Sequence, residues 1–239
     1  MIRKIFMEKR ASGPGGFRYR GHEIQRIETF SDAVFAFAIT LLIVSLEVPK
    51  NFDELLISIR GFLAFGICFA FLFIIWHEQH VFFRRYGLED RATVFLNAVL
   101  LFIVLFYVYP LKFLFSLIFG DSIYSPGRSP FYIRAEQLPQ LMIIYGLGYI
   151  VIYAVFLLLY LHALRRGTQL ELTSHELFDT RTKLYSHAIL IAIGLLSILT
   201  ALVLPNRLGG IAGWIYPLIG PILTVFYVRR GKRRRRIVH

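Results

Sequence analysis

The sequence predicts an all-α membrane protein with six transmembrane helices, and three observations support this prediction. Of its 239 residues, 56% are hydrophobic and only 18% are charged. A mean hydropathy of +0.61 is typical of polytopic membrane proteins and rare among soluble domains. The apolar residues gather into six runs, each long enough to cross about 30 Å of hydrocarbon. Basic residues lie between and beyond these runs, as expected of loops at a membrane surface.

The same composition limits the function classes. The formal net charge is +12, but the lysines and arginines lie between and beyond the apolar runs. Nucleic acid is therefore not the expected partner, and the lipid bilayer is. The single cysteine, Cys68, cannot form an internal disulfide. The first apolar run is too long for a cleavable signal peptide and lacks a small-residue cleavage site, so we expect it to remain in the membrane.

Helix-breaking and polar residues mark the ends of the predicted spans. Residues 1–23 are basic and contain helix-breaking glycines, so they are predicted to form a mobile cytoplasmic arm. The first span covers about 24–48 and ends at Pro49. A short connector leads to the second span, about 56–83. The third, about 92–119, contains Pro110, where a kink or early unwinding is expected.

The second half of the chain continues the pattern. Turn residues fill 120–136, the fourth span covers about 138–163, and a polar loop is predicted at 164–182. The fifth span is about 184–204. The sixth, about 208–228, contains Gly209 and Gly213, a small-xxx-small pair predicted to pack against another helix. The six-helix domain is thus 24–228, followed by a basic cytoplasmic tail, 229–239.

The distribution of basic residues predicts the orientation. Six spans place both chain ends on one side of the membrane, and 21 of the 27 lysines and arginines fall on that side. By the positive-inside rule, both termini are then cytoplasmic.

The first span carries an unusual stripe. At about 100° per residue, one helix face collects six residues, while Asp32 falls roughly opposite. The six are Phe30, Ala33, Phe37, Thr40, Leu41 and Val44. Two interpretations remain open. The stripe is ordinary lipid-facing or packing surface, or several subunits bring it to a common axis as a pore lining, with large apolar side chains as a dewetting constriction and Thr40 as the polar ring.

The polar residues near the cytoplasmic end form a second candidate feature. Asp32 is predicted roughly 9 Å inside that end, with His80 and Trp76 of the second span at roughly 6 and 12 Å. Asp32 is therefore placed to accept a hydrogen bond from either one. Ser31 is expected to join this network, and Arg26 to neutralise Asp32. We favour a structural network over direct contact between Asp32 and a permeating species.

The sequence contains little evidence for metal binding, nucleotide binding or catalysis. His77 and His80 are three residues apart, but no third ligand accompanies them, so no metal site is expected. The phosphate-binding G-x-x-x-x-G-K-[ST], the nucleophile elbow G-x-S-x-G and the Thr-Val-Gly-Tyr-Gly ion filter do not occur. The sequence thus predicts neither an enzyme nor a bound cofactor.

The start of the first span resembles the signature of the transmembrane protein 175 family of potassium channels. The matching residues are Arg26-x-x-x-Phe30-Ser31-Asp32, then Ala33-Val34-Phe35-Ala36 and Thr40-Leu41-Leu42, together with Trp76 and His80. The six-span plan also matches, whereas spans three to six carry no motif of the family. Gln79 stands where members often have a second histidine. A single six-helix repeat is similar to the prokaryotic members, which implies a homotetramer in a prokaryotic cell membrane.

This resemblance implies a passive, potassium-selective leak channel with potassium as the permeant ion. It implies that the first helices line the central pore at the positions of Phe37, Thr40, Leu41 and Val44. Members usually carry an aliphatic residue at the position of Phe37, so a ring of phenylalanines would be bulkier. The motif residues Arg26, Phe30, Ser31 and Asp32, with Trp76 and His80, are implied to hold the pore helices in place.

Within the channel interpretation, Glu47, Asp53 and Glu54 are expected to attract cations at the outer mouth. Two alternatives remain. A secondary transporter, coupled to protons or cations through Asp32 or His80, predicts broken helices near mid-membrane, which Pro217 and Pro221 weakly favour. A non-conducting membrane scaffold is the third.

Overall fold

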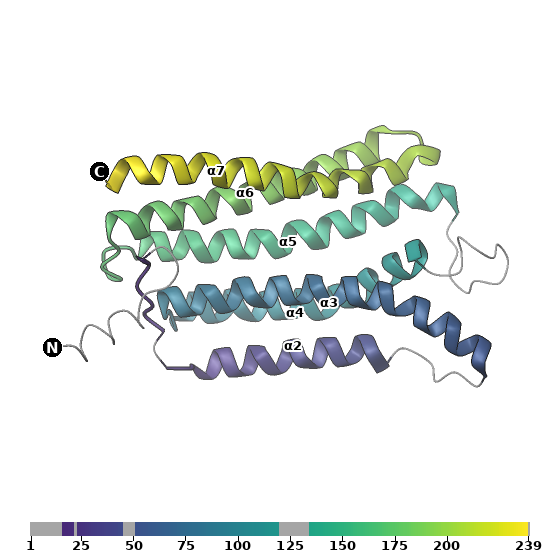
Figure 1. Cartoon of the computed structure of the whole chain (residues 1–239), viewed down its shortest axis with the longest axis horizontal. Helices are drawn as coiled ribbons and strands as arrows, with labels where there is room; N and C mark the ends of the chain where they lie inside the picture. Colours follow the sequence, from purple (N-terminus) through teal and green to yellow (C-terminus); the bar gives the residue numbers. More distant parts are fainter. Residues whose placement is uncertain (1–15, 22, 45–50, 120–133, 239) are drawn as a thin grey trace.

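The structure is a computed structural model that describes residues 16–21, 23–44, 51–119 and 134–238. These residues form six α-helices, which run roughly along one long axis. α2 begins at the same end of the bundle at which α7 finishes (Figure 1). The helices are α2 (Arg26–Val44), α3 (Phe52–Tyr86), α4 (Arg91–Phe119), α5 (Leu138–Arg165), α6 (Ser174–Val203) and α7 (Ile219–Val238). Two 3₁₀ helices, the three-residue η2 (Ala135–Gln137) and the 13-residue η3 (Asn206–Leu218), precede α5 and α7.

In the part of the chain that the structure describes, five segments are long and apolar enough to cross a membrane: 62–86, 91–115, 138–165, 174–203 and 208–234. The helix α2 is the sixth of the bundle and carries Arg26, Glu28 and Asp32 in its first two turns. These helices confirm the predicted all-α membrane architecture. The end of the second span is fixed by Gly87, whose φ of +58° caps α3 and brings its backbone against Arg20.

Several helices are longer than predicted. The connector with Asp53 and Glu54 is the first turn of α3, which begins at Phe52. α4 continues through Pro110 to Phe119 without unwinding. The predicted loop 164–182 is wrong beyond Thr173, where a capping box with Glu176 starts α6. The basic tail is also helical, since α7 runs to Val238.

The core consists of two clusters of buried side chains between the helices. The main cluster of buried apolar side chains contains residues from α2, α3, α4 and α5. A smaller cluster near the opposite end contains Met142, Tyr145, Ala201 and Ala212. There, a Cβ on Gly209 would lie 2.9 Å from the Pro139 ring, and Gly213 faces Met142. The small-residue pair therefore packs η3 against α5, as predicted.

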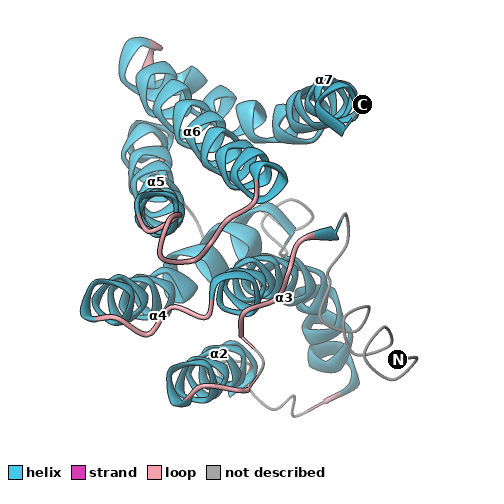
Figure 2. Cartoon of the chain, turned by 90° about the vertical axis from the view of Figure 1, so that its left-hand side faces the viewer, coloured by secondary structure: helices cyan, strands magenta, loops and turns pink. Residues whose placement is uncertain are grey.

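The two edges of the bundle are the least covered. α2 and α7 lie farthest apart in the end-on view (Figure 2). Only 6% of the membrane-crossing segment that contains α7 is buried, against 28–39% for the other four. A helix with so little protein contact is expected to face lipid or another chain.

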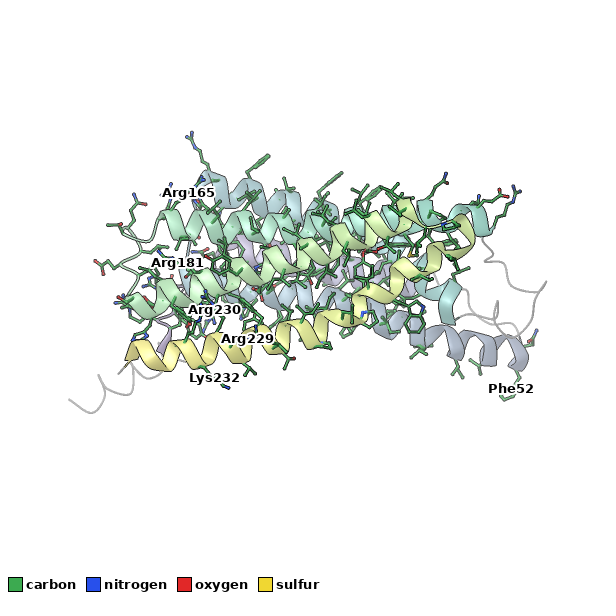
Figure 3. All side chains as sticks on the ribbon, turned by 90° about the horizontal axis from the view of Figure 1, so that it is seen from above. Phe52, Arg165, Arg181, Arg229, Arg230 and Lys232 are labelled. Atoms are coloured by element: carbon green, nitrogen blue, oxygen red, sulfur yellow. The ribbon has the colours of Figure 1, made fainter. Side chains whose placement is uncertain are left out.

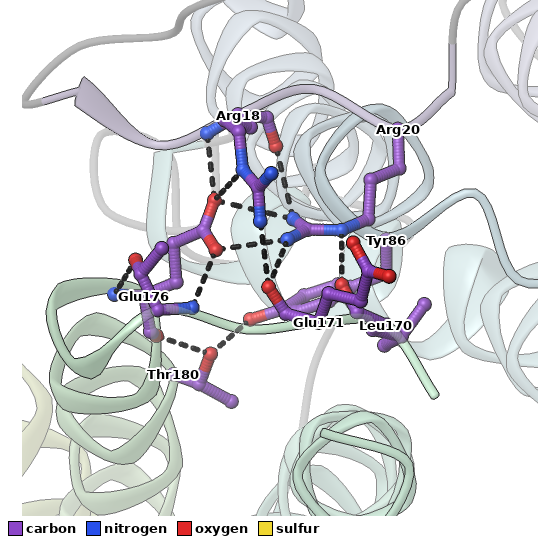
Figure 4. Close-up of polar contacts among 8 residues, drawn as sticks. Arg18, Arg20, Tyr86, Leu170, Glu171, Glu176 and Thr180 are labelled. Atoms are coloured by element: carbon purple, nitrogen blue, oxygen red, sulfur yellow. Dashed lines mark hydrogen bonds and ion pairs between the residues drawn. The ribbon is translucent and has the colours of Figure 1, made fainter. Parts of the chain in front are cut away.

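The predicted N-terminal arm is not mobile along its whole length. Phe17 is buried, with only 1% exposure, and residues 16–21 lie against the ends of α3 and α6 (Figure 4). The backbone amide of Arg18 donates to Glu176 at 2.8 Å, and the Arg20 guanidinium donates to the same carboxylate at 2.8 Å. Arg20 also donates to the Leu170 carbonyl at 2.7 Å. Residues 1–15 lie outside the described part of the chain.

These contacts make Phe17 an anchor for the segment that leads into α2. Truncating it with Phe17→Ala removes a buried aromatic ring, at a cost of about 3 kcal/mol to the contact. We expect trypsin to cleave after Arg18 and Arg20 at least about tenfold faster in this variant, measured by mass spectrometry of the fragments. Phe52→Ala, at an exposed position at the far end of the bundle, is the control and should leave these cleavage rates unchanged. Equal rates in all three proteins would contradict the anchoring role.

Candidate functional site

Near its C-terminal end, α3 directs neighbouring polar side chains to four different helices. Trp76, Glu78 and Gln79 are separated by roughly 200° and 100° around the helix, so each faces a different partner. Trp76 contacts α2, Gln79 contacts α4, and Glu78 contacts α5 and α6. This end of α3 is therefore the point at which the bundle's polar contacts converge.

The contact with α2 confirms one predicted interaction. The Trp76 indole Nε1 donates to Asp32 Oδ1 at 2.7 Å. The His80 ring stacks on Trp76, with centroids 5.5 Å apart and planes at 19°. Trp76, rather than His80, is thus the hydrogen-bond donor to Asp32 among the described residues. His77 also stacks, on Phe73.

Ser31 belongs to a different network from the predicted one. Its hydroxyl donates to the Ile27 carbonyl at 2.7 Å and accepts from Asn97 Nδ2 of α4 at 2.9 Å. Asn97 in turn accepts from Gln79 Nε2. All three side chains are buried, so each polar group needs its partner. Asn97 was missed by sequence reasoning, although an amide within an apolar span was a usable signal.

The predicted role of Arg26 is not realised within one subunit. In the described part of the chain, no ion pair joins Arg26 to Asp32, and Arg26 is exposed. Phe30 is likewise exposed. Of the six motif residues, the structure brings Asp32, Trp76 and His80 together and leaves Arg26 and Phe30 exposed. Ser31 of α2 is bonded instead to Asn97 of α4.

Glu78 forms an ionic cluster that sequence reasoning also missed. Its carboxylate accepts from Lys183 Nζ at 2.6 and 2.9 Å and from the Tyr160 hydroxyl at 2.7 Å. His187 Nε2 lies 3.6 Å away, and its ring stacks on Tyr160. The cluster fastens α3, and through it α2, to the α5–α6 half of the bundle.

The opposite faces of α2 have opposite environments. Phe35, Ala38 and Leu42 are buried against the bundle, whereas the predicted stripe is turned outward. Phe37 is 57% exposed, Thr40 is exposed and Leu41 is half-buried. The Val44 side chain lies outside the described residues, as do the side chains of Asp53 and Glu54 and the whole of Glu47. α2 is therefore fastened on one face and uncovered on the other.

Thr40 has a geometry that suits a cation ligand. Its hydroxyl donates to the Ala36 carbonyl of the preceding turn at 2.9 Å. Because the only hydroxyl hydrogen is used in this bond, the oxygen presents its lone pairs to the exposed side. Lys112 Nζ of α4 donates to the Leu42 carbonyl at 3.3 Å, which supports the same part of α2 from behind.

The fold and the site define the class of the protein: a polytopic helical membrane protein whose first helix has one anchored and one uncovered face. Residues 26–107 match the family described as the endosomal/lysosomal potassium channel TMEM175. A "Potassium channel" of Marivirga tractuosa is 40% identical over 246 residues, which covers 99% of both chains. The chain belongs to the TMEM175 family, which is one of ion channels and not of enzymes.

Solved structures agree with this assignment. A variant of the potassium channel MtTMEM175, crystallised with a nanobody–MBP fusion, superposes with a TM-score of 0.81 at 38% identity, covering 92% of this chain and 99% of that one. The lysosomal potassium-selective channel TMEM175 homolog from Chamaesiphon minutus gives a TM-score of 0.55 at 22% identity, over 86% and 96% of the two chains. The latter shows a similar fold.

Proposed function

We propose that the chain is the subunit of a potassium channel in a prokaryotic cell membrane, and that four copies surround a pore lined by α2. The observation that carries this proposal is the uncovered face of α2. A transmembrane helix with a fastened back and an exposed stripe of Phe37, Thr40 and Leu41 is what a subunit interface at a central axis requires. The excess of basic residues at the end shared by the start of α2 and the end of α7 supports cytoplasmic termini.

The separate positions of Asp32 and of the exposed stripe on α2 support passive conduction. Asp32 is engaged by Trp76, so it acts as a positioning residue rather than as an ion carrier. Phe37 narrows the path, and Thr40 oxygens replace part of the water shell of a dehydrated potassium ion. A coupled transporter is not retained, because the family is one of channels. The last span does change from a 3₁₀ helix to α7 at Ile219, close to Pro217, but α2 to α6 are continuous helices.

The function is tested by recording currents from the purified protein in planar bilayers. Unitary current steps that reverse near the potassium equilibrium potential are expected from a passive potassium channel. Slow, saturable flux that depends on a proton gradient would contradict the proposal, as would a folded protein without current. Cross-linking in the membrane tests the subunit number separately, with a tetramer as the expected largest product.

Thr40→Val tests the polar ring. Valine preserves the shape but removes the oxygen, so we expect the potassium-over-sodium permeability ratio to fall about fivefold, equivalent to the ~1 kcal/mol of one hydrogen-bond-like contact. The measurement is the reversal potential under bi-ionic conditions. Thr224→Val is the matched control, since Thr224 makes the same bond to the preceding turn on α7, far from α2. An unchanged reversal potential would remove Thr40 from the selectivity mechanism.

A further inference from the structure

A basic cavity lies between α6 and α7, close to the end of α3. Its volume is about 240 Å³. Four basic side chains, one acidic side chain, one threonine and two aromatic side chains surround it. The lining residues are Arg85, Phe178, Asp179, Thr182, Lys183, Tyr227, Arg230, Gly231 and Arg234. The cavity is far from α2, which occupies the opposite edge of the bundle (Figure 2).

Two of the four bases have their charge balanced inside the subunit. Lys183 is bonded to Glu78, and Arg234 pairs with Asp179 at 3.0 Å. Within the described residues, neither Arg85 nor Arg230 forms an ion pair with a carboxylate. The cavity therefore has an excess of positive charge that its own carboxylates do not neutralise.

Arg230 is held in place through its Nε and its guanidinium plane, which leaves its two terminal nitrogens as available hydrogen-bond donors. Its Nε donates to Thr182 Oγ1 at 3.1 Å, and its guanidinium lies 4.5 Å from the centre of the Phe178 ring. Across the described part of the chain, the two terminal nitrogens make no hydrogen bond. A guanidinium fixed by stacking, with its outer N–H groups free, is suited to bidentate contact with a phosphate. Arg230 lies between α7 and α6, whereas Lys232 points away from the bundle (Figure 3).

The position of the cavity along α7 selects a lipid as the source of the phosphate. Val225 and Val228, in the turn that precedes the basic residues, have exposed apolar side chains. Very little of the α7 surface is covered by the rest of the protein. The cavity thus opens where the surface of α7 changes from apolar to basic, which is the depth of phospholipid headgroups. Acyl chains along the apolar part of α7 would place a headgroup phosphate beside Arg230.

We propose that this cavity binds the headgroup phosphate of an anionic phospholipid, held by Arg230 and Arg85, with the acyl chains lying along α7. Neither the conduction mechanism nor the subunit number enters this inference. A lipid bound there ties α7, which makes few protein contacts of its own, to α3 and α6.

The test measures lipid binding by native mass spectrometry of the full-length protein in detergent. The probes are dioctanoyl phosphatidylglycerol, its phosphatidylcholine analogue and inorganic phosphate. For the unchanged protein we expect binding of phosphatidylglycerol at least about tenfold tighter than of phosphatidylcholine. Arg230→Gln should weaken phosphatidylglycerol binding about tenfold, whereas Lys232→Gln, the same charge loss two residues away, should leave it within twofold.

A second variant separates the cavity from the general charge of α7. A Cβ on Gly231 meets nothing within 4 Å, so Gly231→Leu fills the cavity without removing a charge or disturbing a packed neighbour. It is expected to weaken phosphatidylglycerol binding as Arg230→Gln does, with the protein still folded by gel filtration. Equal weakening by Arg230→Gln and Lys232→Gln would overturn the proposal. So would full binding to the Gly231→Leu protein, or displacement of the lipid by inorganic phosphate at equal concentration.

Discussion

Replacing Glu78 by alanine is expected to lower the free energy of unfolding by about 3 kcal/mol, because it breaks a largely buried ion pair. Glu78 and Lys183 are only 18% and 22% exposed, and their N–O distance is 2.6 Å. Removing the carboxylate leaves a mostly buried ammonium without its partner and takes the acceptor from Tyr160. The change is measured by thermal and denaturant unfolding of the purified protein in detergent.

A second substitution shows whether the cost is that of an unpaired charge. The double variant Glu78→Gln with Lys183→Met removes both charges, so we expect it to recover at least half of the lost stability. Glu89→Ala, which removes an exposed carboxylate just beyond α3, is the control and should stay within about 0.5 kcal/mol of the unchanged protein. A double variant no more stable than Glu78→Ala would mean that packing, and not charge, dominates this cluster.

The Glu78 cluster also shows where sequence reasoning stops. Hydropathy located the spans because a transmembrane segment must be apolar over its whole width, and this property is local. The partner of Glu78, by contrast, is 105 positions away in the chain. The helical period gives the face on which Glu78 lies but not the helix that covers this face. The hydrogen bonds of Asn97 to Gln79 and Ser31 were not predicted for the same reason.

The ends of the helices were the other weak point. Hydropathy marks the part of a helix inside the bilayer, whereas α6 and α7 continue beyond it as polar helices. The Thr173–Glu176 capping box was a local signal for the start of α6 that the polar composition of the loop obscured. Phe17, which fixes residues 16–21, was hidden within a stretch that is otherwise basic and glycine-rich.

The face of α2 was predictable because a single helix suffices to define it. The stripe of Phe37, Thr40 and Leu41 and the buried row of Phe35, Ala38 and Leu42 follow directly from the 3.6-residue period. The Trp76–Asp32 hydrogen bond was predictable because two antiparallel spans place residues at similar depth. The position of the proposed constriction along the stripe depends on how several subunits assemble, which the sequence of one helix does not define.

Phe37→Ala is expected to raise potassium flux through the channel about tenfold, measured as macroscopic conductance of a fixed amount of protein in liposomes. In the proposed tetramer, four phenylalanine rings would lie at one level of the axis and exclude water, so their removal is expected to wet the path. Phe37→Ile should give an intermediate conductance, because the isoleucine side chain is smaller than that of phenylalanine and larger than that of alanine. Leu199→Ala, on α6 and exposed to the same 57% in the subunit, is the control and should not alter the flux. If Phe37→Ala assembles normally but conducts like the unchanged protein, the narrowest point lies elsewhere on α2, and Phe37 is a lipid-facing or interface residue instead.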